Sequence, residues 1–180
     1  MLRSTTQDAR LLEQAWRLPS AQRFSPLLSQ SVLSICGPTS AANVLRSMGV
    51  DRGKNPFPRL GLRPMSLDQL ADESAEVVPP GWRVSVVRPP TVAALRDELR
   101  ASNSPARRYI ANFSRAPLFG RGGGHHSPLG GYLEDADLAF VLDVNAGFGP
   151  WLVSTERLFA ALATTDRGDG SPRGLVRFER

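Results

Sequence analysis

Apolar residues recur every three or four positions in the first part of the chain, and this spacing predicts amphipathic helices over residues 4–16 and 36–49. Shorter helices are expected at 66–71, 91–101 and 154–162. Pro38 lies just inside the start of the second helix, where a missing N–H costs nothing, and Gly49 stands where a C-terminal cap belongs. Ser66 and Ser154 are the expected N-caps of their helices, because a serine side chain can accept a hydrogen bond from the first turn.

Short runs rich in β-branched and aromatic residues follow and predict strands, at 82–87, 108–115, 127–133 and 138–144. Asp135 falls in the turn between the last two, and residues 176–178 are expected to close the sheet at its edge. Helices followed by antiparallel strands indicate an α+β fold. We expect one domain over residues 1–180, with a helical lobe at about 1–105 and a β lobe at about 106–180.

Composition bounds the class of protein. With 180 residues, 41% hydrophobic and 22% charged, the chain has enough material for one buried core. No apolar run is long enough to cross a bilayer, and the first 16 residues lack the apolar core of a signal peptide. A cytoplasmic location without membrane attachment is therefore expected. A chain from which a signal peptide has been removed would show the same pattern.

The net charge of +5 invites a nucleic-acid function, but the distribution of charge argues against one. Lys54 is the only lysine among 22 basic residues, and the arginines are scattered along the chain. Nucleic-acid binding needs basic residues gathered in a patch and interleaved with aromatic residues. We therefore expect no nucleic-acid partner.

Cys36 is the main candidate for chemistry because it is the only cysteine and opens a predicted helix. Unpaired N–H groups and the helix dipole stabilise a thiolate there, whereas the alternative is a small buried side chain under the helix. Gly37 leaves room for a substrate carbonyl to approach. Gln30 lies six residues upstream, where its amide could donate a hydrogen bond to an oxyanion, or it could be a surface glutamine in a polar loop.

His125 and His126 are the only histidines, and one of them is the expected base for a cysteine nucleophile. Neighbouring strand residues point to opposite faces, so we expect at most one to face Cys36. Asp143 lies 18 residues after His125, a separation that suits a hairpin with the two residues opposite each other. This register selects His125 over His126. A solvated histidine pair or a weak metal site is the alternative, but adjacent histidines are poor ligands for one ion.

Two blocks of the sequence resemble the phytochelatin synthases, which are papain-like enzymes. Residues 30–37 (QSVLSICG) are similar to the nucleophile segment of that family, in which glutamine precedes the cysteine by six residues and glycine follows it. Residues 112–115 (NFSR) and 125–132 (HHSPLGGY) resemble its histidine region, and residues 141–144 (VLDV) resemble its aspartate strand. The resemblance covers roughly residues 24–162.

The resemblance implies a papain-like fold and a Cys36, His125 and Asp143 triad, with Gln30 in the oxyanion hole. Other candidate substrate contacts are Gly37, Ser114, Arg115, Gly124 and His126, and His126 falls on a position that is usually aromatic in the family. The implied reaction is attack on the Cys-Gly amide of glutathione, release of glycine, and transfer of the γ-glutamylcysteinyl group to water or a second thiol peptide. No cofactor is expected, and metal ions would enter only as metal–thiolate substrates.

Two departures from the family pattern leave other substrates open. Residues 145–151 (NAGFGPW) contain no cation, whereas plant members have a basic segment there, and the chain lacks their cysteine-rich C-terminal domain. The main alternative is the same triad acting as an acyltransferase or hydrolase on a thioester bound to a carrier protein, or on a natural-product amide. A non-catalytic binding protein is a third hypothesis, disfavoured by the intact set of site residues.

Overall fold

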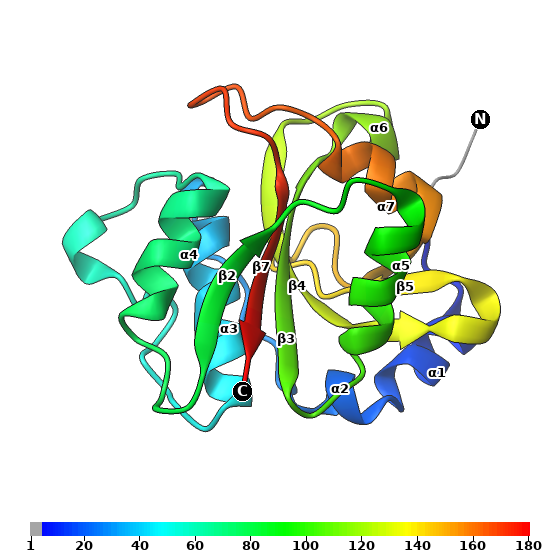
Figure 1. Ribbon diagram of the computed structural model, residues 1–180, viewed down its shortest axis with the longest axis horizontal. Helices are drawn as coiled ribbons and strands as arrows, with labels where there is room; N and C mark the ends of the chain where they lie inside the picture. Colours follow the sequence, from blue (N-terminus) through cyan, green and yellow to red (C-terminus); the bar gives the residue numbers. More distant parts are fainter. Residues whose placement is uncertain (1–4) are drawn as a thin grey trace.

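A seven-stranded antiparallel sheet forms the centre of the computed structural model, which describes residues 5–180 (Figure 1). The sheet is antiparallel at every strand pair. Its strands lie in the order β1 (Thr5–Thr6), β6 (Trp151–Ser154), β5 (Leu138–Val141), β4 (Gly124–Leu133), β3 (Arg107–Ser114), β7 (Gly174–Glu179) and β2 (Arg83–Val87).

Helices cover both faces of this sheet. The first face packs against α1 (Ala9–Trp16), α2 (Pro19–Gln22), α3 (Cys36–Ser47) and α4 (Leu67–Ala75). The second face packs against α5 (Val92–Ala101), α6 (Ala116–Phe119) and α7 (Thr155–Leu162). Short 3₁₀ turns occur at Leu33–Ile35, Pro58–Leu60 and Glu134–Ala136.

The alternation of side chains along each strand divides the core into two clusters. In β3, Ile110 points to the first face, while Tyr109 and Ala111 point to the second. In β7, Val176 and Leu175 divide in the same way. Because successive strand residues face opposite sides, a strand covered on both faces must be apolar at nearly every position. All five of these side chains are fully buried.

The sequence signals for helix boundaries are confirmed. Ser66 caps α4 in a reciprocal capping box with Gln69, an arrangement that typically contributes about 1 kcal/mol. Ser154 accepts a hydrogen bond from the first turn of α7. Gly49 follows α3 with a φ of +86°, a backbone conformation that favours glycine.

Several predicted boundaries are wrong in an instructive way. Strand β4 begins at Gly124 rather than 127, so the histidines belong to the strand, and β5 ends at Val141 rather than 144. Strand β7 lies inside the sheet between β3 and β2 instead of closing its edge. Strands β1 and β6 were not expected, because a two-residue strand and the segment after a glycine-rich loop give little periodic signal. The first helix begins at Ala9 rather than at residue 4, because Thr5–Thr6 form β1 and Asp8 caps the helix; residue 4 itself lies outside the described residues.

Within residues 5–180, no helix is both long enough and apolar enough to cross a membrane.

Candidate active site

The Cys36 thiol stands at the first residue of α3, directly after the 3₁₀ turn at Leu33–Ile35. No side chain caps this helix end, so no capping side chain accepts a hydrogen bond from its first N–H groups. Cys36 is a free cysteine and is partly exposed. Cys36 is thus not fully buried under the helix, and it lines a hollow.

Helix α3 places Cys36 beside the first part of β4, where β4 has a neighbouring strand on one side only. Strand β5 pairs with β4 only from Leu129 onward, while the first residues of β4 pair with β3 alone. Ser40 of α3 occupies this free edge, and its hydroxyl donates to the His126 carbonyl at 3.1 Å. The nucleophile helix therefore takes the place that a paired strand would fill.

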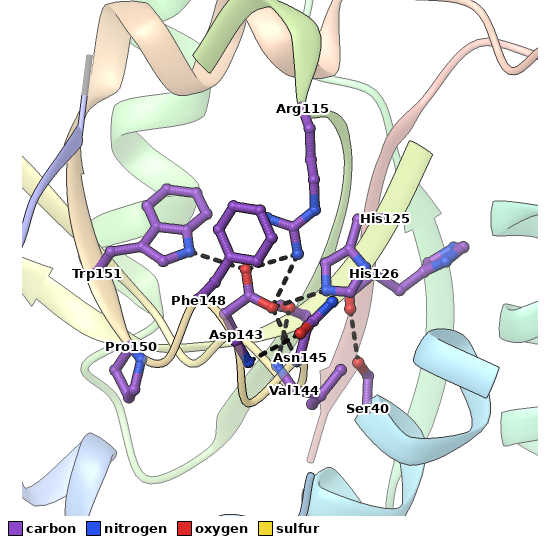
Figure 2. A network of polar contacts seen from close by, with 12 residues as sticks. Ser40, Arg115, His125, His126, Asp143, Val144, Asn145, Phe148, Pro150 and Trp151 are labelled. Carbon is purple, nitrogen blue, oxygen red and sulfur yellow. Dashed lines mark hydrogen bonds and ion pairs between the residues drawn. The ribbon is translucent and has the colours of Figure 1, made fainter. Parts of the chain in front are cut away.

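Both histidines approach the thiol, which corrects the expectation that at most one could. The Cys36 Sγ atom lies 3.7 Å from His126 Nδ1. His125 is near enough to lower the pKa of the thiol as well. The two rings do leave β4 on opposite sides, as alternation requires, and Figure 2 shows them turned apart. A thiol at the strand edge, rather than over one face, is reachable from both sides.

Asp143 is the anchor of the first histidine. Its Oδ1 atom lies 2.9 Å from His125 Nε2, and the carboxylate also accepts from Arg115 at 2.8 and 2.9 Å (Figure 2). The Trp151 indole N–H and the Asn145 backbone N–H donate to it at 2.9 Å each. A buried carboxylate with this many donors is held ionised and fixed in position.

Asp143 reaches His125 without being its ladder partner. Strand β5 ends two residues earlier, and the β4–β5 register shifts between Leu129 and Gly131. The expected simple hairpin with Asp143 opposite His125 is therefore wrong, although the two side chains meet. A bulge and the divergence of the strands deliver the carboxylate instead.

His126 is bonded to different groups. Its Nε2 atom lies 2.8 Å from Asn112 Nδ2, and the Asn112 carbonyl oxygen accepts from Arg173. Arg173 is in turn paired with Asp166 at 2.8 Å. This set joins β3, β4 and the segment that leads into β7.

The pKa values of the site follow from these contacts. Burial alone would raise the pKa of the Cys36 thiol, but hydrogen bonding to His125 and His126 outweighs it and holds that pKa well below its ordinary value. Burial opposes a charge on His125, yet its hydrogen bonds to Asp143 and Cys36 raise its pKa. Burial of Asp143 is likewise outweighed by His125 and Arg115, so the pKa of its carboxyl is lowered. The arrangement favours a thiolate beside an imidazolium.

Two hollows adjoin the two histidines. The larger, with a volume of about 770 Å³, is lined by Cys36, His126 and a set of charged side chains: Arg63, Asp166, Asp169 and Arg173. The second, of about 610 Å³, is lined by Gln30, His125, Arg115, Arg121 and Phe148, among others. Leu33, an exposed apolar residue, and Gly124 line both hollows.

The structure brings most of the predicted site residues together. Gln30 lines the second hollow beside His125, and its amide oxygen is buried without a hydrogen-bond partner among the described residues. Gly124 and Arg115 also line hollows, but Ser114 lines neither of them. A Cβ added at Gly37 would make ordinary contacts of 3.6–3.7 Å with Leu70 and His126, so packing alone does not require glycine there.

Asn112, Asp166 and Arg173 were missed as polar site residues by sequence reasoning. Asp166 and Arg173 lie in a loop rich in glycine and charge, where nothing in the local pattern distinguishes them from solvent-exposed residues. Arg173 is only 6% exposed, and burial of an arginine is the signal that the sequence does not contain. Among residues 5–180, no group of three or more His, Cys, Asp and Glu side chains is placed to hold a metal ion.

A comparison with solved structures defines the class of fold. The chain is similar to the peptidase domain of Streptococcus ComA, with a TM-score of 0.57 and 15% identity over 85% of this chain and 96% of that domain. That domain has the papain-like cysteine peptidase fold, so the expected fold class is confirmed. At this identity, the likeness concerns the fold alone.

Comparison of the amino-acid sequence with known families and proteins identifies the family of this chain. The family description of phytochelatin synthase matches residues 63–175, and the chain belongs to that family. It is 28% identical to wheat (Triticum aestivum) glutathione gamma-glutamylcysteinyltransferase 1 over 98% of this chain and 40% of that protein. It is 36% identical to the Lotus japonicus enzyme 3 of the same name over 48% of this chain and 18% of that protein. The chain thus spans about two fifths or less of the length of these relatives.

Proposed function

We propose that this protein is a cysteine-dependent acyltransferase that cleaves the Cys-Gly amide of a γ-glutamyl thiol peptide such as glutathione. The observation that carries the proposal is a Cys36 thiol with a lowered pKa that lines a cavity with charged residues, beside His125, which is bonded to the buried Asp143 carboxylate. Membership of the phytochelatin synthase family supports the same chemistry.

The geometry supports His125 as the base. A carboxylate only accepts hydrogen bonds, so Asp143 holds a hydrogen on His125 Nε2 and leaves Nδ1 free to take the thiol proton. The Cys36 thiolate then attacks the amide carbon. The negative charge that develops on the carbonyl oxygen would be stabilised by the Cys36 backbone N–H and the Gln30 side-chain amide.

Collapse of this intermediate breaks the C–N bond. His125 gives its proton to the departing amine, glycine leaves, and the γ-glutamylcysteinyl group remains on Cys36 as a thioester. Water, or the thiol or amine of a second peptide, then attacks the thioester carbonyl while His125 takes its proton. The Cys36 thiolate leaves and the enzyme is restored.

The larger hollow supports a γ-glutamyl substrate. A γ-glutamyl group carries an α-amine and an α-carboxylate at the end remote from the scissile amide. The ion pair of Asp166 with Arg173 in this hollow presents an anion and a cation that can bind these two charges.

The second hollow supports a transfer reaction, because a transferase must also accommodate an acceptor. Arg115 and Arg121 line this hollow, so it contains the cations that residues 145–151 lack. The same hollow would also admit the end of a carrier-bound thioester, which is the second candidate function. In either case we propose that the reaction needs no cofactor and that metal ions enter only as part of a metal–thiolate substrate. We also propose a cytoplasmic location, with no nucleic-acid partner and no membrane partner.

Intact-protein mass spectrometry after brief incubation with glutathione tests the proposal. We expect wild type to gain the mass of one γ-glutamylcysteinyl group and to release glycine, and Cys36→Ala to do neither. A phosphine reductant removes any mixed disulfide but leaves the thioester, so treatment with it is the chemical control.

Outcomes separate substrate from mechanism. An adduct on Cys36→Ala, or glycine release by that variant, would disprove Cys36 as the nucleophile. A wild-type protein that forms no adduct with glutathione but is acylated by a carrier-bound thioester would reject glutathione in favour of the second candidate.

A further inference from the structure

The two histidines beside Cys36 have outer ring nitrogens with opposite kinds of hydrogen-bond partner. His125 Nε2 faces a carboxylate, which only accepts. His126 Nε2 faces the Nδ2 atom of Asn112 at 2.8 Å, and an amide NH₂ only donates. The lone pair of His126 Nε2 is therefore the acceptor in this contact.

Arg173 determines which end of the Asn112 amide faces His126. The guanidinium has donors and no acceptor, and its Nη1 atom bonds the Asn112 carbonyl oxygen. The NH₂ end of the amide must then point to His126. Both Asn112 and Arg173 are buried, and the same Nη1 atom of Arg173 also donates to Asp166 at 2.8 Å.

We propose that His126 is a neutral hydrogen-bond donor to the Cys36 thiolate, with its single ring hydrogen on Nδ1, and that Asn112 and Arg173 impose this tautomer. In a neutral imidazole only one nitrogen carries a hydrogen, so a lone pair on Nε2 places the hydrogen on Nδ1. That nitrogen lies 3.7 Å from the Cys36 sulfur. The inference rests on the proposed role of Cys36 as the nucleophile.

The two histidines therefore have complementary roles. His125 presents a lone pair at Nδ1 and takes the thiol proton, while His126 presents an N–H at Nδ1 and stabilises the charge left on sulfur. His126 contacts the reacting atom and is a catalytic residue in this scheme, whereas Asn112 and Arg173 are positioning residues. The Ser40 hydroxyl on the His126 carbonyl and the β3–β4 ladder hold the ring in place.

The same chain of bonds connects the thiol with the substrate cavity. Arg173 lines the larger hollow together with Cys36, so the residue that orients Asn112 is also exposed to the substrate side. Through Asn112 and His126, this guanidinium is three hydrogen bonds from the sulfur.

Nitrogen-15 NMR of histidine rings tests the tautomer without any turnover. Only two histidines contribute, so wild type gives four ring nitrogens, and His126→Leu identifies the pair that belongs to His126. We expect a protonated Nδ1 and an unprotonated Nε2 in His126, and hydrogens on both ring nitrogens of His125, whose imidazolium is paired with the thiolate. A hydrogen on His126 Nε2, or on both nitrogens at neutral pH, would overturn the proposal. Asn112→Asp replaces the donor with an acceptor and should move the His126 hydrogen to Nε2.

The pKa of the Cys36 thiol tests the hydrogen bond itself, measured from the pH dependence of its alkylation. Asparagine at position 126 can place an N–H near the site of Nδ1, and leucine has a similar volume without a donor. We expect His126→Leu to raise the thiol pKa by about one unit, a roughly tenfold loss of thiolate, and His126→Asn to retain most of the wild-type value.

These measurements distinguish the inference from the proposed function. Equal thiol pKa values in wild type and His126→Leu would overturn the role of His126 even if glutathione is cleaved. Conversely, the NMR pattern and the pKa shift can both appear in a protein that does not accept glutathione. If His126→Leu does not fold, the wild-type and Asn112→Asp spectra still decide the tautomer.

Discussion

The Asp143 carboxylate is the most heavily bonded group of the site, with donors from His125, Arg115, Trp151 and Asn145. Arg115 is itself held by Phe148, whose ring lies 3.7 Å from the guanidinium carbon. Arg115 and Phe148 both line the second hollow, so this cation–π contact forms part of its wall. Residues 145–151, which depart from the family pattern, therefore support the triad carboxylate.

The opposite pKa shifts of Cys36 and His125 predict how alkylation of the thiol and turnover depend on pH. The pKa of Cys36 is lowered and that of His125 is raised, so between the two values the pair exists as thiolate and imidazolium. We expect alkylation of Cys36 by iodoacetamide to rise with pH through a midpoint well below about 8.5, the ordinary value for a thiol. The kcat/KM for substrate should be bell-shaped, with limbs that belong to the pair.

His125→Asn is the control for this prediction. It removes the group whose hydrogen bond and charge lower the thiol pKa, so the alkylation midpoint should move to higher pH. A wild-type midpoint at or above the ordinary thiol value would contradict the ion pair.

At the scale of elements, the turn between β4 and β5 is fastened by Asp137. This residue ends the 3₁₀ turn at Glu134–Ala136 with a φ of +51°, a conformation that aspartate and asparagine tolerate better than most residues. Its carboxylate accepts from Tyr132 of β4, Thr155 of α7 and Arg96 of α5. One carboxylate thus ties two helices, α5 and α7, to the hairpin of β4 and β5.

Asp137→Asn should lower the free energy of unfolding in a pH-dependent way. Burial would raise the pKa of Asp137, but its bonds to Arg96, Thr155 and Tyr132 lower it to about 2. A carboxyl whose pKa is lowered in the folded state stabilises the protein above its unfolded pKa of about 3.9 and loses that contribution as pH falls toward 2.

Urea unfolding of wild type and Asp137→Asn at several pH values measures this difference. We expect the variant to be less stable by roughly 1 kcal/mol between pH 5 and 7, with the difference shrinking below about pH 4. A difference that stays constant down to pH 3 would show that the charge of Asp137 does not contribute.

At the scale of the whole molecule, the larger hollow is assembled from segments far apart in the chain. Cys36 comes from the start of α3, Arg63 from the loop before α4, His126 from β4, and Asp166 and Arg173 from the loop before β7. In Figure 1 this last loop, drawn in orange-red, extends beyond the end of the sheet. The lining of this hollow therefore depends on the assembled fold.

Substrate analogues test this hollow without altering the protein. Glutaryl-Cys-Gly lacks the α-amine of glutathione, and 4-aminobutanoyl-Cys-Gly lacks the α-carboxylate. If Asp166 and Arg173 bind these groups, each analogue should be cleaved with a kcat/KM at least tenfold lower than glutathione, a loss of about 1.4 kcal/mol or more. Equal cleavage of all three peptides, measured by glycine release, would show that the hollow does not bind the α-amine and the α-carboxylate.

The sequence by itself determined the helices, their caps and the order of the candidate site residues. Serine N-caps, Gly49 and the apolar stripe of α3 act within one or two turns of chain, so their effects are local and can be read from neighbouring residues. Cys36 was predicted from its place at a helix start, whereas His125 and Asp143 were predicted from a hairpin register that the structure does not have and from the family resemblance.

Tertiary structure alone decided how the second histidine and the buried arginines are used. The free edge of β4 exists because β5 diverges from it, and only this edge lets His126 reach the thiol from the side opposite His125. Arg115 and Arg173 become site residues by being buried against Asp143 and Asn112. Such roles depend on contacts between residues tens of positions apart, and packing rather than local pattern determines those contacts.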